Sequence, residues 1–459
     1  MNRYEKASTL SVEPRAVYDW HVRPGALQRL TPPWQVIRSS GSVSGLERGS
    51  RVKLVMGRGL LRTTWIAEHT RVEPGRGFED VQVKGPFRYW RHAHRFEPWG
   101  EDMCVLRDSI EYLIPGGTLG RWLAGKQIER SIAKTFEYRH QATADDLAFH
   151  RRYSSGRRLR VAITGASGLI GSTLASILST GGHEVICLVR AAPAAGPYRQ
   201  AQWDPRRGVL ETEKVEGLDA VVHLAGENIS RRHWTKRQME RIRRSRVEAT
   251  ANLVQSLGAL DRPPGIFLAA SAIGIYGDRG DELLTEESPH GCGFLADVCQ
   301  EWEEAAAAAE RWASRVVSAR FGMVLSPQGG ALAKMLPAFR LGGGGKIGSG
   351  EQVMSWISID DVGRALVHIL QTPELEGPVN LVSPGSLPNR EFTKSLANTL
   401  NRPAMAPLPS ILARALFGRM AEEILLSGSR VEPTKLLASG YEFRHPELGS
   451  SLSFLLGRG

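Results

Sequence analysis

The stretch Arg160-Val-Ala-Ile-Thr-Gly-Ala-Ser-Gly-Leu-Ile-Gly-Ser172 decides the fold of this chain. Its first part, the apolar run at residues 159–163, predicts a short buried strand. A glycine-rich turn follows, and then an amphipathic helix pattern that places Leu174, Ile177 and Leu178 on one face. A helix that starts directly after such a turn presents free N–H groups and a positive dipole to phosphates. The order of strand, turn and helix therefore predicts a dinucleotide-binding site.

The three glycines of this turn each have a separate task. Gly165 permits the tight turn, Gly168 lets the backbone approach a pyrophosphate, and Gly171 lets the helix pack closely on the strand. The alternative is a glycine-rich loop that binds nothing. The strand before the turn and the helix after it favour the dinucleotide site over that alternative.

The bulk composition is that of a globular protein. The chain has 459 residues, enough for two or three domains, with 42% hydrophobic and 23% charged residues. No apolar run approaches the roughly 20 residues of a membrane span. Residues 1–6 lack the apolar core of a signal peptide. We therefore expect a cytoplasmic protein without a membrane span, and the sequence leaves its oligomeric state open.

The net charge of +11 raises the question of an anionic partner. Eight of the sixteen residues from 231 to 246 are Lys or Arg. Three explanations are open: a solvated helix face, a nucleic-acid-binding surface, or a grip on an anionic cofactor. No aromatic-rich recognition motif accompanies this run, so we expect no nucleic-acid partner.

Residues 1–153 show an α+β pattern that ends in one long helix. Predicted strands lie at residues 4–10, 34–37, 51–55, 63–67, 78–83, 88–96 and 103–113, and the helix covers residues 118–149. This order resembles the helix-grip fold of the START-like or polyketide-cyclase-like ligand-binding superfamily. The resemblance implies a curved sheet around the long helix, with an apolar cavity that takes a lipid or another hydrophobic ligand.

The sequence predicts no metal site. The four cysteines are scattered and form no Cys-x-x-Cys pair. His92 and His94 alternate with other residues along one predicted strand. Isolated histidines on such a strand are usually surface or core residues, so we do not assign them as metal ligands.

The polar, basic segment 150–158 predicts a linker, and residues 157–459 then read as α/β. Further strands are expected at residues 184–189, 219–224, 265–270 and 315–320, with helices at 235–257 and 299–313 between them. Alternating strands and helices predict a doubly wound parallel sheet. The glycine-rich segment 342–350 predicts a mobile loop, and Asp360 is expected to cap a helix.

Landmarks along this second part resemble the extended short-chain dehydrogenase/reductase superfamily. They are the turn at Thr164–Gly171 and the segments His223–Gly226, Ser271–Gly277, Arg320–Leu325 and Trp356–Val362. The chain is more closely similar to the uncharacterised NAD(P)-dependent epimerase-like branch, whose members are sometimes called cell-division inhibitors, through residues 225–229, 245–248 and 407–448. This resemblance implies a Rossmann domain with a small C-terminal helical lobe at residues 383–459 on the substrate side.

The resemblance also implies a set of cofactor-binding residues. They are Thr164, Gly165, Ser167, Gly168, Leu169, Ile170, Gly171, Arg190, Leu224, Ala225, Arg246 and Val324. Arg190 follows the second strand, where an acidic residue would accept the ribose hydroxyls of NAD, whereas an arginine pairs with a 2′-phosphate. Because no acid stands near Arg190, we expect NADP; the alternative is an exposed arginine without a ligand.

The catalytic motif of the superfamily is absent. Hydride-transferring members use a Tyr-x-x-x-Lys pair, and alignment places Leu295 and Cys299 at those two positions. Leucine cannot donate a proton, and a neutral thiol cannot act as an ammonium group does. The third member of the triad falls at Ala272, next to Ser271. We therefore predict Ser271 and Tyr276 as the catalytic residues.

Three functions remain open from the sequence. The first is an NADP-dependent oxidoreductase or epimerase that acts on a small organic molecule or sugar nucleotide. The second is an NADP(H)-binding sensor without turnover, which the missing Tyr-x-x-x-Lys pair suggests. The third places the function in the N-terminal domain, which would bind a lipid or an aromatic molecule.

Overall fold

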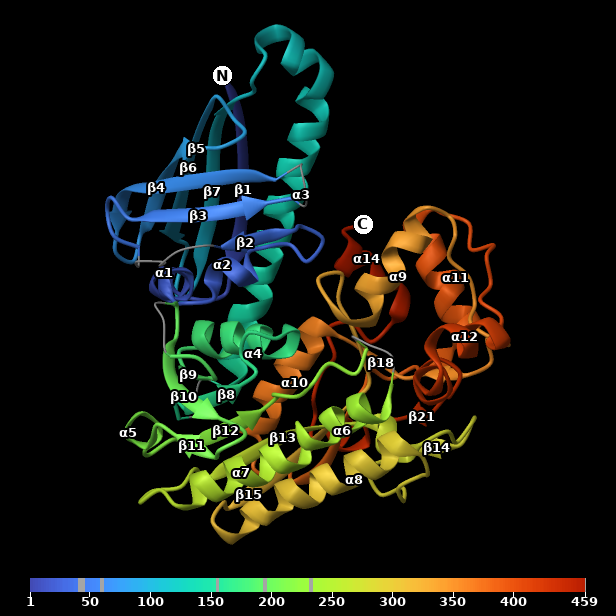
Figure 1. The fold of residues 1–459 in the computed structure, drawn as a ribbon. Helices are drawn as coiled ribbons and strands as arrows, with labels where there is room; N and C mark the ends of the chain where they lie inside the picture. Colours follow the sequence, from blue (N-terminus) through green and yellow to red (C-terminus); the bar gives the residue numbers. More distant parts are fainter. Residues whose placement is uncertain (40–45, 58–61, 154–156, 193–195, 231–233, 459) are drawn as a thin grey trace. The chain divides into compact units, whose positions relative to one another are not determined.

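The computed structural model describes residues 1–39, 46–57, 62–153, 157–192, 196–230 and 234–458 (Figure 1). The chain folds into two compact units. The N-terminal unit consists mainly of residues up to Arg158, and the C-terminal unit consists mainly of residues from Leu159 onward. The linker predicted at residues 150–158 starts too early, because a helix continues to Arg152, and its residues 154–156 lie outside the described part. In the described part of the chain, no helix is long and apolar enough to cross a membrane.

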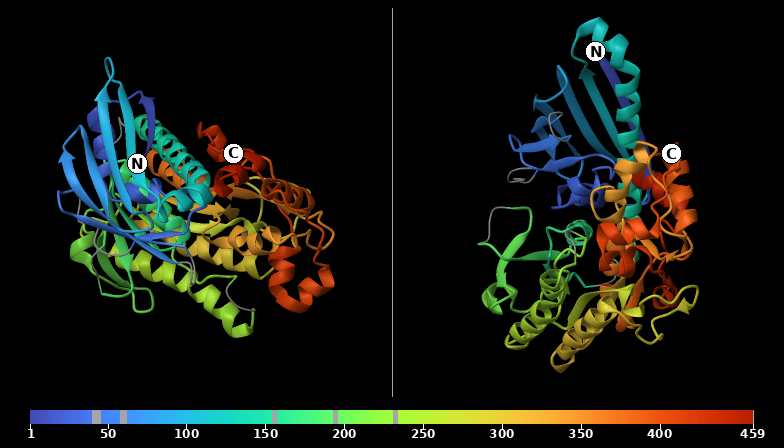
Figure 2. Two further views of the ribbon diagram at one scale, coloured as in Figure 1. Left: turned by 90° about the horizontal axis from the view of Figure 1, so that it is seen from above. Right: turned by 45° about the vertical axis from the view of Figure 1, so that its right-hand side comes forward.

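The N-terminal unit is a seven-stranded antiparallel sheet with one long helix. The strand order is β1-β7-β6-β5-β4-β3-β2. The strands are β1 (Asn2–Leu10), β2 (Ile37–Ser39), β3 (Arg51–Met56), β4 (Thr63–Glu73), β5 (Gly77–Lys84), β6 (Tyr89–Pro98) and β7 (Cys104–Leu113). Helices α1 (Pro14–Val22) and α2 (Ala26–Arg29) join β1 to β2, and α3 (Gly117–Arg152) runs along the sheet (Figures 1 and 2). The predicted helix-grip fold is confirmed.

The strand predicted at residues 34–37 is wrong except for its last residue. Residues 32–35 form a turn instead, in which the N–H of Gln35 donates to the carbonyl of Pro32 at 3.0 Å. Two consecutive prolines, Pro32 and Pro33, precede the apolar residues and favour that turn. The pairing with β3 therefore begins only at Ile37.

The interior of this unit is apolar at both ends and polar in the middle. Inward residues of β6 and β7 alternate strictly with outward ones. One apolar cluster contains Phe96 and Leu106, and another contains Trp90 and Ile110. Between them lie polar side chains that are all buried, namely His92, His94, Asp108 and His140. The apolar cavity implied by the resemblance is thus interrupted by a polar band.

The C-terminal unit is built on an eight-stranded sheet with the order β11-β10-β9-β8-β12-β13-β15-β19. The bounds are β8 (Arg160–Thr164), β9 (Glu184–Val189), β10 (Arg199–Asp204), β11 (Val209–Leu210), β12 (Ala220–His223), β13 (Ile266–Ala272), β15 (Arg315–Phe321) and β19 (Gly377–Leu381). Strands β9, β8, β12, β13, β15 and β19 are parallel, and β10 pairs with β11 as an antiparallel hairpin. The strand order reverses between β8 and β12, where ligands of doubly wound folds bind.

Helices lie on both faces of this sheet, with α7 (Val247–Gly258) and α8 (Phe294–Ala307) on one side and α10 (Ile359–Gln371) on the other (Figure 1). The doubly wound Rossmann fold is confirmed. The single helix predicted at residues 235–257 is two, because α6 (Lys236–Arg244) ends at Ser245. The Ser245 hydroxyl donates to the carbonyl of Ile242 and accepts from the N–H of Glu227, so it holds the break.

The C-terminal lobe is mostly helical, as predicted. Its main helices are α11 (Asn389–Leu400), α12 (Ser410–Phe417), α13 (Thr434–Ala438) and α14 (Leu448–Leu456), and α9 (Gly330–Arg340) packs into the same core. Phe392, Leu396 and Leu452 belong to this core. The pair of β17 (Val353–Met354) with β20 (Leu387–Pro388) ties the lobe to the segment before it, in which β16 (Met323–Leu325) pairs with β18 (Trp356–Ser358).

Two local expectations in this region are wrong. The glycines of segment 342–350 serve close packing: a Cβ on Gly344 would lie 2.5 Å from the Phe339 ring, and one on Gly345 would lie 2.2 Å from the Ala406 carbonyl oxygen. The cap of α10 is Ser358, whose hydroxyl accepts from the N–H of Asp361. Asp360 instead pairs with arginines of α10 and of the tail.

The buried ion pair between α2 and α3 allows the stability of the N-terminal unit to be tested. Arg29 donates two hydrogen bonds of 2.7 Å to Asp146, and both side chains are buried. We expect Asp146→Asn to lower the free energy of unfolding by about 3–5 kcal/mol, because it removes the buried negative charge that binds both sides of the Arg29 guanidinium. Urea unfolding followed by tryptophan fluorescence measures this. Asp19→Asn, which removes an exposed partner of Arg15, should cost less than about 1 kcal/mol; equal losses would contradict the expectation.

Candidate active site

The phosphate turn has the geometry that its glycines predict. Gly165 has a φ of +67°, and a Cβ there would stand 3.0 Å from the backbone of Leu224. The N–H of Gly168 donates to the carbonyl of Gly165 at 2.9 Å, and α4 (Leu169–Thr180) starts at the next residue. A Cβ on Gly171 would lie 2.3 Å from the Gly165 carbonyl oxygen. Ser167 and Gly168 are exposed at the tip.

Thr164 joins the turn to β12. Its hydroxyl oxygen accepts the N–H groups of Leu224 and Ala225 at 3.0 and 3.1 Å, and it lies 2.7 Å from Nδ1 of His223. Burial lowers the pKa of His223 to about 4, so the ring is neutral and its Nδ1 can accept the Thr164 proton. Thr164 is fully buried and acts in shaping the site rather than as an exposed contact.

Three apolar residues of the predicted cofactor set meet beside the turn. Leu169, Ile170 and Val324 all pack against one hydrophobic cluster. The Leu169 side chain lies under the loop at residues 329–330, since a Cβ on Gly329 would be 3.5 Å from it. The structure therefore brings β16 next to the start of α4.

Arg246 stands at the break between α6 and α7 and is directed toward the end of β12. Its guanidinium donates to the carbonyl of Glu227 at 3.1 Å and lies 5.1 Å from the ring centre of Trp302. A Cβ on Gly226 would approach it to 3.5 Å. Burial lowers the pKa of Arg246, and the guanidinium stays charged at neutral pH. Of the basic run 231–246, this residue is the one placed at the site; residues 231–233 lie outside the described part.

Arg190 follows β9 directly and its side chain is exposed. Within the described residues no ion pair involves it. Its backbone carbonyl accepts a hydrogen bond from Gln202 at 3.5 Å. Because the side chain is exposed, the guanidinium is available to solvent or to a ligand.

Leu295 and Cys299, the residues aligned with the Tyr-x-x-x-Lys pair, lie beside the turn that follows β13. Leu295 and Cys299 are four residues apart on α8, and both approach Gly274, with separations of 3.4 and 4.0 Å from an added Cβ. Gly274 belongs to the 3₁₀ turn Ile273–Tyr276 that follows β13. Burial raises the pKa of the Cys299 thiol to about 12, so no charge resides there at neutral pH.

Ser271 and Tyr276 belong to one hydrogen-bonded network. The Ser271 hydroxyl donates to Oε1 of Glu303 at 2.6 Å. Arg320 binds both oxygens of Glu303 at 2.8 Å and also donates to the Tyr276 hydroxyl at 2.8 Å. Tyr276 in turn donates to Asn380 at 2.8 Å. Both predicted catalytic side chains are buried, with 2% of Ser271 and none of Tyr276 exposed.

Sequence reasoning missed Glu303 and Asn380. For Glu303 a signal existed, because Leu295, Cys299 and Glu303 recur every four residues and so share one face of α8. For Asn380 there was none, since β19 itself was not predicted. Burial raises the pKa of Tyr276, although Arg320 opposes the shift, so this hydroxyl is protonated at neutral pH.

Comparisons with known proteins identify the protein families that three parts of this chain match. Residues 161–382 match the NAD dependent epimerase/dehydratase family, residues 10–137 match the family of polyketide cyclase / dehydrase and lipid transport, and residues 408–455 match a domain of unknown function. The fold and the turn thus define a nucleotide-binding Rossmann protein with a START-like domain in front of it.

Individual relatives narrow the class. An epimerase family protein of Mycobacterium tuberculosis is 42% identical over 298 residues, which are 65% of this chain and 98% of that protein. The human epimerase family protein SDR39U1, solved with NADPH, is 34% identical with a TM-score of 0.60 over 66% of this chain and 100% of that one. A nucleoside-diphosphate sugar epimerase from Corynebacterium glutamicum is 33% identical with a TM-score of 0.79, over 99% of this chain and 90% of that one. This chain belongs to the epimerase family.

The three glycines allow the fold and the ligand to be tested separately. Gly171→Ala places a methyl group 2.3 Å from a carbonyl oxygen, so both the melting temperature and dinucleotide binding should fall. For Gly168→Ala the nearest atom is 3.1 Å away. We expect the melting temperature of this variant to stay close to wild type while dinucleotide affinity falls by at least about tenfold. Thermal melting with and without NADPH measures both; unchanged affinity in Gly168→Ala would show that no phosphate approaches there.

Proposed function

We propose that this protein is an NADP-dependent oxidoreductase or epimerase that acts on a small organic molecule or a sugar nucleotide. The observation that carries the proposal is the edge of the sheet between β8 and β12. The phosphate turn follows β8, the buried guanidinium of Arg246 lies beside Gly226 after β12, and the exposed Arg190 follows β9 on the other side of β8. The NADPH in the structure of the human relative supports the same cofactor here.

Arg190 is the residue that we assign to cofactor choice. It stands at the end of the second strand of the parallel sheet, where the ribose of the adenosine half is recognised in this fold. A guanidinium there attracts a 2′-phosphate, and a carboxylate would repel it. The side chain is exposed and holds no ion pair within the described residues, so a ligand would not have to displace a partner.

Isothermal titration with NADPH and NADH tests this assignment. We expect the wild type to bind NADPH more tightly, and Arg190→Asp to lose roughly 10- to 100-fold in NADPH affinity, as expected for a charge-assisted hydrogen bond. Arg207→Asp removes another exposed arginine from the turn between β10 and β11 and should leave both affinities unchanged. Equal affinities for NADPH and NADH in the wild type would overturn the assignment.

We assign proton exchange with the substrate to Ser271 and Tyr276. Ser271 is the better placed, because its proton already points to a carboxylate, Glu303, that can receive it, while its lone pairs stay free to accept. Tyr276 already donates to Asn380 and accepts from Arg320, so a substrate must displace Asn380 to take its proton. Arg246 supplies the positive charge that the absent lysine would supply in related enzymes.

Single substitutions separate the two hydroxyls. NADPH oxidation is followed with aldehydes and ketones, and NADP⁺ reduction or epimer formation is followed with nucleoside-diphosphate sugars. We expect Ser271→Ala to lower the rate by about 10²–10⁴-fold, the range for loss of an acid/base group, and Tyr276→Phe to lower it less. Tyr441→Phe serves as the control, since its buried hydroxyl donates to the backbone carbonyl of Asp361 on α10. An unchanged rate in Ser271→Ala would remove that residue from the mechanism.

A second candidate function is binding of NADP(H) without turnover. The observation that favours it is the pair Leu295 and Cys299, which fills the place of the usual acid/base pair with two uncharged, poorly proton-donating groups. Tight NADPH binding together with neither cofactor turnover nor epimer formation for any compound of the panel would select this alternative. The family match of residues 10–137 additionally supports a hydrophobic ligand for the N-terminal unit, and the polar band in its interior favours a ligand that carries a polar group.

A further inference from the structure

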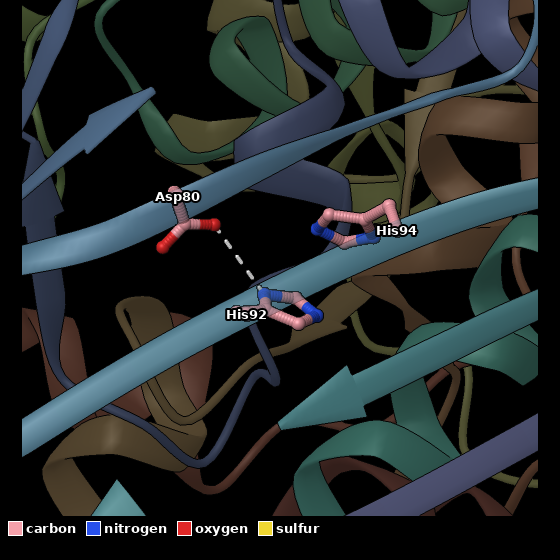
Figure 3. A group of neighbouring side chains, drawn as sticks. All are labelled: Asp80, His92 and His94. Carbon is pink, nitrogen blue, oxygen red and sulfur yellow. Dashed lines mark ion pairs between the residues drawn. The ribbon is translucent and has the colours of Figure 1, made fainter. Parts of the chain in front are cut away.

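The polar band of the N-terminal unit contains an unusual set of buried side chains. Asp80 on β5 and His92 and His94 on β6 lie close together, as Figure 3 shows. The antiparallel register pairs Asp80 directly with His92, which puts both side chains on one face of the sheet. His92 and His94 are two residues apart and therefore share that face. Only 3% of His92 and 6% of His94 is exposed, so the cluster lies in the interior.

The spacing of these groups is close to that of a metal site. One ligand atom from each of the three residues lies within 4.8 Å of the others. In a tetrahedral zinc site, ligand atoms about 2.1 Å from the ion stand about 3.4 Å apart. Closing the cluster around an ion therefore requires each atom to move inward by less than about 1 Å.

Asp108, on β7, orients the two imidazoles from behind. Its Oδ1 lies 3.3 Å from Nε2 of His92 and 2.6 Å from Nδ1 of His94. Nδ1 of His92 faces Asp80 at 3.4 Å, so the ring presents one nitrogen to the cluster and the other to Asp108. For His94 the nitrogen left for the cluster is Nε2, and in Figure 3 one of its ring nitrogens points toward the Asp80–His92 pair. Metal-binding histidines commonly donate their second N–H to a carboxylate in this way.

The carboxylate that orients the rings is itself fixed. Its second oxygen, Oδ2, lies 3.0 Å from Nε2 of His140 on α3, and Nδ1 of His140 contacts the Ser8 hydroxyl on β1 at 2.9 Å. The arrangement thus extends from the sheet to the long helix. Nδ1 of His94 contacts the other oxygen of this carboxylate at 2.6 Å, although the angle is not that of a regular hydrogen bond.

We propose that Asp80, His92 and His94 bind a divalent transition-metal ion inside the N-terminal unit, with Asp108 as the group that orients both histidines. Two imidazoles and one carboxylate suit zinc and the neighbouring first-row metals. Three protein ligands leave one coordination position for water or for a polar group of a ligand. This site is separate from the nucleotide turn, and its proposal does not rest on the function proposed above.

The test uses the full-length, untagged chain and Zn²⁺ as the probe. After treatment with a chelator, the protein is titrated calorimetrically with Zn²⁺ and its metal content is measured by mass spectrometry. We expect one ion per chain in the wild type, loss of that ion in Asp80→Asn, and a roughly 10- to 100-fold weaker affinity in Asp108→Asn, the usual effect of losing an orienting carboxylate. His290→Gln removes an exposed histidine near the 3₁₀ turn of the other unit and should bind as the wild type does.

X-ray absorption on the zinc-loaded wild type provides a measurement that does not depend on the folding of any variant. Two imidazole ligands and at least one oxygen ligand at about 2.0–2.2 Å are expected. A wild type that retains no ion, an all-oxygen or sulfur-containing ligand shell, or undiminished binding in a folded Asp80→Asn variant would each overturn the proposal.

Discussion

The nucleotide-binding half of this protein depends on the hydroxyl group of Thr164. This hydroxyl lies at the end of β8 and accepts two N–H groups from the end of β12, so it fixes the two strands at the point where the strand order reverses. The turn can then leave β8 only through Gly165, whose left-handed conformation and contact with Leu224 leave no room for a side chain. His223 completes the arrangement because burial keeps its ring neutral and able to accept the Thr164 proton.

The site differs from that of its superfamily in lacking the Tyr-x-x-x-Lys pair on α8. The helix α8 carries Leu295 and Cys299 where a tyrosine and a lysine would act, but the same helix also carries Trp302 and Glu303. Trp302 contacts the guanidinium of Arg246, and Glu303 accepts a hydrogen bond from Ser271 and pairs with Arg320. A positive charge and a carboxylate thus stand against the helix that lacks the tyrosine and the lysine, and the catalytic roles proposed above depend on these two groups.

The sequence was most informative where function and fold depend on neighbouring residues. The phosphate turn, the alternation on β6 and β7 and the long helix α3 all follow from local patterns, and the structure has them. The break at Ser245 was missed because it depends on a contact with Glu227, which lies in another segment. The glycines of residues 342–350 indicated mobility, whereas they are required by contacts with Phe339 and Ala406 that only the folded lobe creates.

The buried histidines are a second case in which the sequence around a residue does not reveal the contacts that decide its role. Along β6 alone, His92 and His94 look like isolated polar residues in a strand that begins and ends in core aromatics. Their chemistry arises from the register with β5, which supplies Asp80, and from β7, which supplies Asp108. A polar band between two apolar clusters would cost considerable free energy if its groups were unpaired. The ion pairs within it offset that cost, and so any molecule that enters between the sheet and α3 must either preserve these contacts or replace them with its own.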